Sequence, residues 1–380
     1  MSNLTPKDGQ PESSPSGAHS FAEILSQPQC WADCLRRLEA EGMVREIGKR
    51  FGNCPEWVFI GCGSSYYIAL AAAASWTAIT GTRARALPAS ELLLFPDLVF
   101  GGMKEFVPVL ISRSGQTSEV LRAAQLLNEK RISSLAISCA IKEKLEKLAT
   151  VSVVLPEADE QSTVMTRSFT SMLLSLQYLA AALAGNGGLL QNFQALPSVA
   201  EKVLQDLPVR VREFVSHNPF SDYVCLGQGP YFGLACESAL KVMEMSRTYA
   251  QSFHTLEFRH GPKSIVSGQT VISLLLSEAN YGAETEVLEE VKDLGAKTVV
   301  VAKHITDRLR ATADLAVELD CALPYPACLA PFVFAGQLLG FYTALNNGLD
   351  PDRPPNLSRV VFLADETELP KIANANANER

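Results

Sequence analysis

The chain carries one pattern twice, at an offset of 166 residues (223 − 57). The stretch "WVFIGCGSSYYIALAAAA" begins at Trp57 and "YVCLGQGPYFGLACESAL" begins at Tyr223, and each reads as a hydrophobic strand, a Gly-x-Gly turn and a helix. A second strand and helix follow in both copies, as "VPVLISRSGQTSEVLRAAQLLN" and "VISLLLSEANYGAETEVLEEVKDLG". A repeat of this length is too long for a solenoid unit. It therefore predicts two similar subdomains in one chain.

Strands alternate with helices in both halves, which is typical of a parallel sheet with helices on both faces. We predict an α/β fold of two doubly wound, flavodoxin-like parallel-sheet subdomains in tandem, separated by a helical stretch near residues 165–217. The first twenty residues are polar and lack an apolar signal core, so we expect a disordered tail. The predicted limits are 1–20 for this tail, 21–195 for the first domain with an N-terminal helix, 196–365 for the second domain, and 366–380 for a C-terminal tail.

The composition argues against several classes of partner. The chain has 33 basic and 41 acidic residues, a net charge of −8 and no run of Lys or Arg, so we expect no grip on nucleic acid or on an anionic membrane. The most hydrophobic helix candidate, residues 169–184, is too short to span a bilayer and is predicted to be buried. The nine cysteines form no Cys-x-x-Cys pair, which gives no support for a metal site and suits a reducing cytoplasm.

A polar loop follows the strand "VPVLI". It holds Ser112, Ser114, Gly115 and Thr117 and leads into the helix "EVLRAAQLL". The amides at a helix start carry partial positive charge, so such a loop suits a phosphate, although Thr117 could equally serve as an N-cap. The second copy has lost this chemistry, which favours ligand binding over mere turn formation in the first. No complete G-x-G-x-x-G or nucleotide-triphosphate loop exists, so we expect a small phosphorylated molecule.

A charged stripe lies on a helix in the second copy. Glu237, Lys241 and Glu244 are spaced i, i+4 and i+7 among apolar residues, so they share one face of a largely buried helix. A solvated ion-pair stripe is the alternative, but buried charges are more typical of a site. The turn "RHGP" that follows holds His260, one of only five histidines, for which we predict a catalytic role.

Five motifs together resemble the sugar isomerase (SIS) domain family: "GCGSSY", "ISRSGQTSE", "STVMTRSFTSM", "ESALKVMEMS" and "EFRHGPKS". The resemblance covers nearly the whole chain past residue 20 as a tandem pair of such domains. It implies a 6-phosphate cradle, a substrate-side loop, a glutamate that moves a proton between C1 and C2, a histidine that assists ring opening, and a lysine one turn before the glutamate. The matching residues are Ser112, Arg113, Ser114, Thr117 and nearby Ser65 for the cradle, Thr166 for the loop, Glu244, His260 and Lys241.

The resemblance implies an enzyme that binds a sugar 6-phosphate, needs no metal or cofactor, and works as a cytoplasmic homodimer or higher homo-oligomer. We expect aldose–ketose isomerisation of a hexosamine 6-phosphate with ammonia release. The alternatives are a tagatose- or ketose-6-phosphate isomerase without amine chemistry, a fructosamine-6-phosphate deglycase and a non-catalytic sugar-phosphate sensor.

Two departures from the related glucosamine-6-phosphate synthases bear on this choice. The chain begins Met-Ser without a cysteine nucleophile, so we expect no glutaminase activity. Arg359 stands where the synthase has a catalytic lysine, and arginine does not form a Schiff base. We therefore favour isomerase or deaminase chemistry over amination, with Arg359 contacting substrate oxygens.

Overall fold

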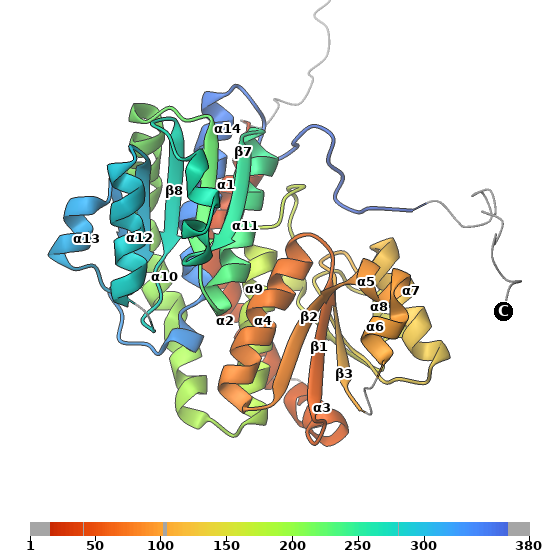
Figure 1. Ribbon diagram of the computed structural model, residues 1–380. Helices are drawn as coiled ribbons and strands as arrows, with labels where there is room; N and C mark the ends of the chain where they lie inside the picture. Colours follow the sequence, from red (N-terminus) through yellow and green to blue (C-terminus); the bar gives the residue numbers. More distant parts are fainter. Residues whose placement is uncertain (1–15, 41, 102–104, 280, 364–380) are drawn as a thin grey trace, which may run out of the picture.

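The computed structural model describes residues 16–363 except residues 41, 102–104 and 280. It forms two lobes, each built on a parallel sheet of five strands (Figure 1). The strand order is β2-β1-β3-β4-β5 in the first lobe and, read from the other edge, β7-β6-β8-β9-β10 in the second. Numbered within each lobe, both orders become 2-1-3-4-5, the flavodoxin order. The predicted tandem α/β fold is thus confirmed.

Each sheet is parallel throughout, so its carboxyl ends meet along one edge. The strands of the first sheet are β1 (Glu56–Gly61), β2 (Arg83–Pro88), β3 (Val107–Ile111), β4 (Leu135–Ser138) and β5 (Val151–Val154). The strands of the second sheet are β6 (Asp222–Gly227), β7 (Tyr249–His254), β8 (Thr270–Leu275), β9 (Lys297–Ala302) and β10 (Leu315–Glu318).

The Gly-x-Gly turns take the same backbone conformation in both lobes. Gly63 has φ 55° and ψ −128°, and Gly229 has φ 55° and ψ −127°, where residues with a Cβ are strained. A Cβ on Gly61 or Gly227 would lie 2.5 Å from the backbone of the following helix. One glycine thus turns the chain and the other lets the helix pack on its strand.

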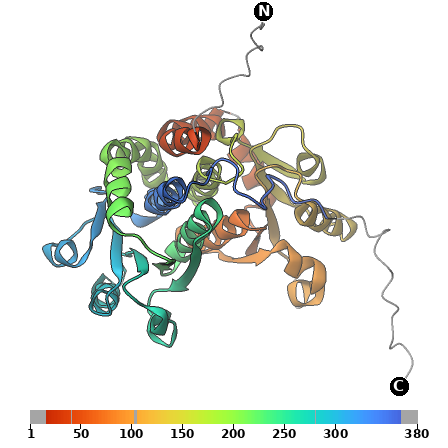
Figure 2. The same cartoon turned by 90° about the horizontal axis from the view of Figure 1, so that it is seen from above.

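Helices cover the outer face of each sheet, and a shared helical layer lies between the two sheets (Figures 1 and 2). The central layer brings α4 against α9 and α11, and α11 against α14. Alternate residues of β3 serve different cores: Val109 and Ile111 join the central core, and Leu110 joins the outer one. The helices are α1 (Ala18–Leu25), α2 (Gln27–Ala40), α3 (Met43–Phe51), α4 (Ser64–Thr80), α5 (Ala89–Leu94), α6 (Pro96–Phe100), α7 (Ser118–Glu129), α8 (Lys144–Leu148), α9 (Arg167–Leu183), α10 (Gly187–His217), α11 (Pro230–Ser246), α12 (Tyr281–Asp293), α13 (Asp307–Thr312) and α14 (Phe334–Asn346).

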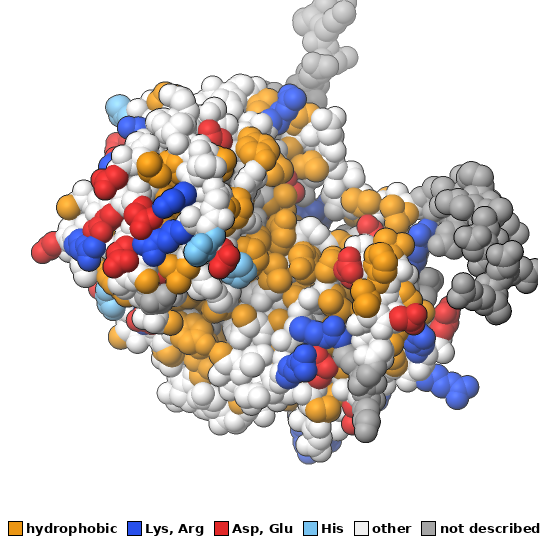
Figure 3. Space-filling view, viewed as in Figure 1, with side chains coloured by type: hydrophobic (Ala, Val, Ile, Leu, Met, Phe, Trp, Pro, Cys, Tyr) orange, Lys and Arg blue, Asp and Glu red, His pale blue; other side chains and the backbone are white. Residues whose placement is uncertain are grey.

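The surface differs between the lobes on the face shown in Figure 3. Hydrophobic side chains gather in a band between the lobes, whereas acidic and basic side chains are interspersed over the second lobe. Ion pairs there include Arg259 with Glu290 at 2.7 Å and Arg310 with Glu318 at 2.7 Å. Charges of opposite sign thus neutralise each other locally on this lobe.

Several elements differ from the sequence-based expectation. The pattern did not identify the edge strands β2, β7 and β10 or the buried helix α14. The predicted boundary between residues 195 and 196 falls inside α10, a 31-residue helix that continues through Pro197 and Pro208. Helix α1 already begins at Ala18, inside the segment predicted to be a disordered tail. The remainder of the predicted tails, residues 1–15 and 364–380, lies outside the described residues.

The start of α1 is held by the C-terminal segment. The Asp350 carboxylate accepts a hydrogen bond from Gly17 N at 3.0 Å, and the Asp352 carboxylate accepts from His19 N at 3.0 Å and Ser20 N at 2.6 Å. Carboxylates at a helix N-terminus satisfy its free amides and interact favourably with its dipole. These contacts explain why ordered structure begins before residue 21.

Candidate active site

Four polar side chains meet where α4 of the first lobe packs against α11 of the second. The Lys241 ammonium donates to Glu244 Oε2 at 2.6 Å and to the Ser64 hydroxyl at 3.3 Å, and lies 3.2 Å from Glu237 Oε1. Ser64 in turn donates to Glu237 Oε1 at 3.1 Å. Lys241 and Glu237 are fully buried, whereas 19% of the Glu244 side chain is exposed. Glu244 is therefore the charged member of the cluster that a ligand can reach.

The protonation of this cluster is unusual. Burial raises the pKa of Glu237 to about 7, against the lowering effect of Lys241. Burial alone would lower the pKa of Lys241, but the carboxylates of Glu237 and Glu244 outweigh it, so this pKa is raised. Among the described residues, Glu237 Oε2 is buried without a hydrogen-bond partner. At neutral pH the lysine therefore stays charged beside Glu244, while Glu237 is close to the midpoint of its titration. Perturbed groups of this kind are typical of functional sites.

Close helix packing brings the two halves of the cluster together. A Cβ on Gly233 of α11 would lie 2.6 Å from Tyr67 O and 2.7 Å from Ala71 N of α4. Only glycine fits at this crossing, so the axes of α4 and α11 can approach until Ser64 reaches Glu237. The cluster is thus a property of the junction between the lobes rather than of either lobe alone.

The loop from Ser112 to Thr117 begins where β3 ends, and β3 is the neighbour of β1, which leads into Ser64. The Ser112 and Thr117 hydroxyls face each other at 3.2 Å, and Ser114 Oγ accepts a hydrogen bond from Gln116 N at 3.2 Å. The Thr117 side chain makes no capping hydrogen bond to α7, so the alternative that it serves as an N-cap is wrong. Hydroxyls and the amino end of α7 therefore lie together at the carboxyl edge of the sheet, where an anion is favourable.

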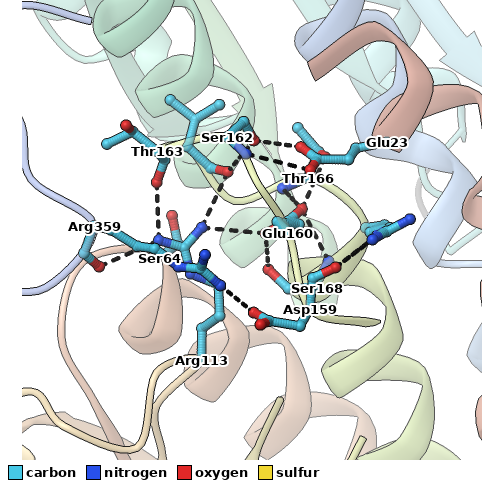
Figure 4. A network of polar contacts seen from close by, with 12 residues as sticks. Glu23, Ser64, Arg113, Asp159, Glu160, Ser162, Thr163, Thr166, Ser168 and Arg359 are labelled. Carbon is cyan, nitrogen blue, oxygen red and sulfur yellow. Dashed lines mark hydrogen bonds and ion pairs between the residues drawn. The ribbon is translucent and has the colours of Figure 1, made fainter. Parts of the chain in front are cut away.

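The Arg113 side chain lies in a buried polar network (Figure 4). Its Nη1 donates to Glu160 Oε2 at 3.2 Å and to Val164 O at 3.1 Å, and its Nη2 donates to Thr163 O at 2.9 Å and to Arg359 O at 3.2 Å. Only 5% of the side chain is exposed. Because protein acceptors engage both terminal nitrogens, the guanidinium is not presented to a ligand. This differs from the phosphate contact expected of Arg113.

Glu160 is the centre of the same network. Its carboxylate accepts from Thr166 N at 2.6 Å, Thr166 Oγ1 at 2.9 Å and Ser168 N at 3.2 Å, at the start of α9. Thr166 is fully buried and its hydroxyl is engaged, so it does not offer the expected substrate contact. On the other side of the segment, Glu23 of α1 accepts from Ser162 N at 3.3 Å. The substrate-side loop of the prediction is therefore held rigidly by α1, α9 and Arg113.

The C-terminal segment crosses the start of α7. Ser118 N donates to Val361 O at 3.3 Å, and Leu363 N donates to Ser118 Oγ at 3.1 Å. The Arg359 side chain pairs with Asp159, and both side chains are 38% exposed. Arg359 is therefore beside the candidate site, but its guanidinium is directed to a protein carboxylate (Figure 4).

His260 lies in an exposed turn after β7, where its backbone N–H donates to Glu257 O at 3.0 Å. In the described part of the chain, no hydrogen bond or ion pair joins it to Glu244. One chain alone thus does not bring the predicted histidine to the cluster.

The structure brings together Lys241 and Glu244 as the sequence predicts, and it adds residues that the sequence reasoning did not assign. Ser65 is buried in the first turn of α4, and its neighbour Ser64 makes the contacts to the cluster. The sequence places Glu237 in the charged stripe but indicates no role for it. Glu160 lacked any signal, since its partner Arg113 is 47 residues away.

Other features of the described residues do not add to this site. They contain no group of three His, Cys, Asp or Glu side chains placed to hold a metal. No helix among them is long and apolar enough to cross a membrane. A cavity of about 490 Å³ lies by the amino ends of β1 and β3, lined by residues such as Phe51, Cys54 and Phe106. It contains none of the candidate residues, and its position opposite the carboxyl edge makes it a poor candidate for the chemistry.

Residues 52–182 match the SIS domain family. The chain is also 26% identical over 342 residues to the glutamine–fructose-6-phosphate aminotransferase (isomerizing) of Methanothermobacter thermautotrophicus, which spans 89% of this chain and 56% of that protein. The Helicobacter pylori aminotransferase of the same name is 27% identical over 351 residues, 89% of this chain and 58% of that protein. The chain thus spans just over half the length of these relatives.

Two solved structures are similar to this chain over almost their full length. The glucosamine-6-phosphate deaminase of Thermotoga maritima is 28% identical with a TM-score of 0.74, over 90% of this chain and 99% of that one. The tagatose-6-phosphate ketose/aldose isomerase of Escherichia coli has a TM-score of 0.80 over 92% of this chain and 96% of that one, but at 22% identity it speaks for the fold alone. Residues 52–182 thus match a SIS domain, and nearly the whole chain is similar to isomerising aminotransferases and to a glucosamine-6-phosphate deaminase.

Proposed function

We propose that the chain is a phosphosugar aldose–ketose isomerase that acts on a hexosamine 6-phosphate and releases ammonia. The observation that carries this proposal is the contact of 2.6 Å between fully buried Lys241 and partly exposed Glu244. Lys241 also contacts Ser64, which follows β1, the neighbour of the strand that leads into the hydroxyl loop. Similarity to a glucosamine-6-phosphate deaminase over 99% of that chain supports the amine chemistry.

In this proposal the loop from Ser112 to Thr117 binds the 6-phosphate. The hydroxyls of Ser112, Ser114 and Thr117 and the amides at the start of α7 are its donors, and Ser65 lies near the same ligand. The phosphate serves as a remote anchor whose binding energy positions the reacting carbons against Glu244.

Glu244 takes a proton from one carbon of the opened sugar and returns it to the neighbouring carbon. A carboxylate in a partly desolvated site has the basicity for this transfer. Lys241 keeps the ionised form of Glu244 in place, since it is charged and fixed by a second carboxylate. The carboxylates of Glu237 and Glu244 together raise the pKa of Lys241 and so keep it protonated.

Ring opening is assigned to His260. His260 is exposed, and within the described chain no hydrogen bond joins it to Glu244. We therefore propose that His260 of the partner subunit completes the site in a homo-oligomer. A cytoplasmic location remains part of the proposal. It is supported by the scattered cysteines, which are all free in the structure.

The remaining predicted residues take positioning roles. Arg113 and Thr166 hold the segment 159–166 through Glu160, and Arg359 holds the C-terminal segment through Asp159. In this proposal the sugar contacts the backbone of the loop 112–117 and the main chain around residue 163. It does not contact the side chains of Arg113, Thr166 and Arg359.

A panel of substrates tests the proposal. Glucosamine, galactosamine and fructosamine 6-phosphates and tagatose 6-phosphate are each incubated with the protein, and ammonia and ketose phosphate are measured separately. We expect both products from a hexosamine 6-phosphate, with loss of activity in Glu244→Gln. Ketose without ammonia would favour the tagatose-type isomerase, whose fold this chain shares. Turnover of fructosamine 6-phosphate alone would indicate a deglycase, and binding without any turnover would indicate a sensor.

A further inference from the structure

The cavity of about 490 Å³ at the amino edge of the first sheet lies on the opposite side of that sheet from the candidate active site. Its wall is formed by the end of α3, the end of α6, the start of β3 and the turn before β4. The proposed catalysis uses none of these residues. The volume is within the range of about 300–1,000 Å³ in which proteins bind small molecules. The lining residues that characterise the cavity are Arg50, Phe51, Cys54, Phe100, Glu105 and Phe106.

Three phenylalanine rings give this cavity an aromatic wall. Phe51 is 5% exposed and packs edge-on against Trp57, with ring centroids 6.2 Å apart and an interplanar angle of 71°. The rings of Phe100 and Phe106 lie 6.1 Å apart at an angle of 47°, and the Lys130 ammonium lies 4.7 Å from the centre of the Phe100 ring. Neighbouring side chains thus restrain the rings. Aromatic groups favour centroid separations of about 4.5–7 Å, so this wall suits a ligand that has an aromatic ring.

The same cavity carries two opposite charges. Arg50, in the last turn of α3, and Glu105, just before β3, both line it and are both exposed to solvent. In the part of the chain that the structure describes, neither side chain is paired with another charged residue. A ligand that presents an anionic and a cationic group can pair with both, and neither charge of the wall is then left unpaired.

We propose that this cavity binds an aromatic amino acid, with its ring against the three phenylalanines, its carboxylate paired with Arg50 and its ammonium paired with Glu105. A guanidinium can form two parallel hydrogen bonds to a carboxylate, which orients the ligand as well as holding it. A nucleoside monophosphate is the competing class, because it also joins a ring to an anion. Its phosphate carries about two negative charges and it has no cationic group, so it would leave Glu105 facing a like charge. The inference does not rest on the proposed function.

Calorimetric titration of the full-length protein with L-phenylalanine, L-tyrosine and L-tryptophan tests the proposal. We expect at least one of them to bind at one site per chain with a dissociation constant below about 1 mM. For L-phenylalanine, the analogues phenylpropionate, which lacks the ammonium, and phenylethylamine, which lacks the carboxylate, should each bind about tenfold more weakly. Failure of all three amino acids to bind would overturn the proposal, and so would tighter binding of adenosine monophosphate.

Cys54 gives a local readout, because its partly exposed thiol lines the cavity. Burial raises the pKa of this thiol, so brief labelling with iodoacetamide is run at about pH 8.5. A saturating amino acid should slow the labelling of Cys54 and leave that of Cys62, at the carboxyl end of β1, unchanged. Both thiols lie in the tryptic peptide 51–83, in which fragment spectra assign the label. Binding without protection of Cys54 would place the ligand elsewhere and overturn the proposal.

Charge variants test the two ion pairs separately. Arg50→Gln and Glu105→Gln should each weaken the binding of the amino acid about tenfold. Arg50→Gln should not weaken phenylethylamine further, and Glu105→Gln should not weaken phenylpropionate further, because each analogue already lacks the group that the variant leaves unpaired. The control is Arg45→Gln, at an exposed position of α3 outside the cavity lining, which should bind like the wild type. An equal loss in Arg45→Gln would show that overall charge and not this cavity holds the ligand.

Discussion

The two lobes have the same strand order, but each contributes different residues to the candidate site. In the first lobe the loop after the third strand carries the hydroxyls of Ser112, Ser114 and Thr117, which bond to one another or to the backbone of the same loop. In the second lobe the equivalent loop is filled from within: the buried Glu284 carboxylate accepts from Ser277 N at 2.8 Å and from Ser277 Oγ at 2.6 Å. A protein carboxylate thus takes the place that a ligand anion is proposed to take in the first lobe.

In the equivalent helices α4 and α11, the charged residues are in the second lobe and not in the first. Helices α4 and α11 are both 17 residues long and related by the offset of 166 residues. The positions of Glu237, Lys241 and Glu244 on α11 correspond to Ala71, Ser75 and Ala78 on α4. The first lobe therefore has the proposed phosphate loop and an uncharged helix, and the second lobe has a loop occupied by its own Glu284 carboxylate and a charged helix. The close crossing of α4 and α11 places Ser64 of the first lobe against the charged helix of the second.

The largest effect is expected from the charged helix. In Glu244→Gln the amide cannot accept the proton, so kcat should fall roughly 10²–10⁴-fold, the usual contribution of a general base. The dissociation constant for the sugar phosphate should stay within about twofold, because the anchor lies in the other lobe. Steady-state kinetics and calorimetry on the same sample measure both quantities.

The control for this prediction is Glu201→Gln, an equally conservative change at an exposed position of α10. It should leave kcat unchanged. Full activity in Glu244→Gln would refute the division of roles between the two helices.

A paired substitution in the two loops should separate binding from stability. Replacing Ser112 and Thr117 together with alanine removes two donors to the phosphate, so KM should rise roughly 30- to 900-fold if each charge-assisted bond contributes about 1–2 kcal/mol. Ser277→Ala in the second lobe should leave KM unchanged, since its hydroxyl serves Glu284. An equal rise in KM for both variants would show that the loops do not differ in role.

The sequence predicts the parts of this comparison that depend on local pattern. Strands buried on both faces, such as β3 and β8, form continuous apolar runs, and the stripe of Lys241 and Glu244 follows from helical spacing. The edge strands β2 and β7 are partly exposed and polar, so their segments lack that signal. The repeat predicts the two lobes because the same Gly-x-Gly turn, with the same backbone angles, is needed in each of them.

Side-chain partners that are distant in the sequence could not be predicted in this way. Nothing local distinguishes Ser64 from Ser65; the orientation of α4 at its first turn decides which of them meets Glu237. Arg113 stands beside phosphate-type residues, but acceptors 47 and more residues away take its guanidinium. Glu160 is one acidic residue among 41 until the fold brings it to the start of α9.

Removing the Glu284 carboxylate from the loop of the second lobe should lower the stability of the protein and leave its activity unchanged. In Glu284→Ala the buried Ser277 amide and hydroxyl lose their acceptor, which should lower the free energy of unfolding by about 1–3 kcal/mol. Acetate supplies a carboxylate of similar shape, so it should restore part of the melting temperature relative to chloride at equal ionic strength. Calorimetric melting in both salts tests this, and an unchanged melting temperature in chloride would mean that Glu284 does not act as an internal anion.

The smallest effect is expected from the pH dependence of the cluster between the lobes. Burial raises the pKa of Glu237 to about 7, so Glu237 is protonated below neutral pH and charged above it. When Glu237 ionises, it shares the Lys241 ammonium with Glu244, so the contact between Lys241 and Glu244 weakens and Glu244 takes the substrate proton more readily. We therefore expect kcat to rise as pH increases through 7, on the order of threefold. The substrate phosphate also titrates, near pH 6, and gives an inflection of its own. Glu237→Gln separates the two: its pH–rate profile should keep the inflection of the phosphate and lose the one near 7. If the inflection near 7 persists in this variant, Glu237 is only a structural partner of Lys241, and the second lobe contributes its charge to the site through Glu244 alone.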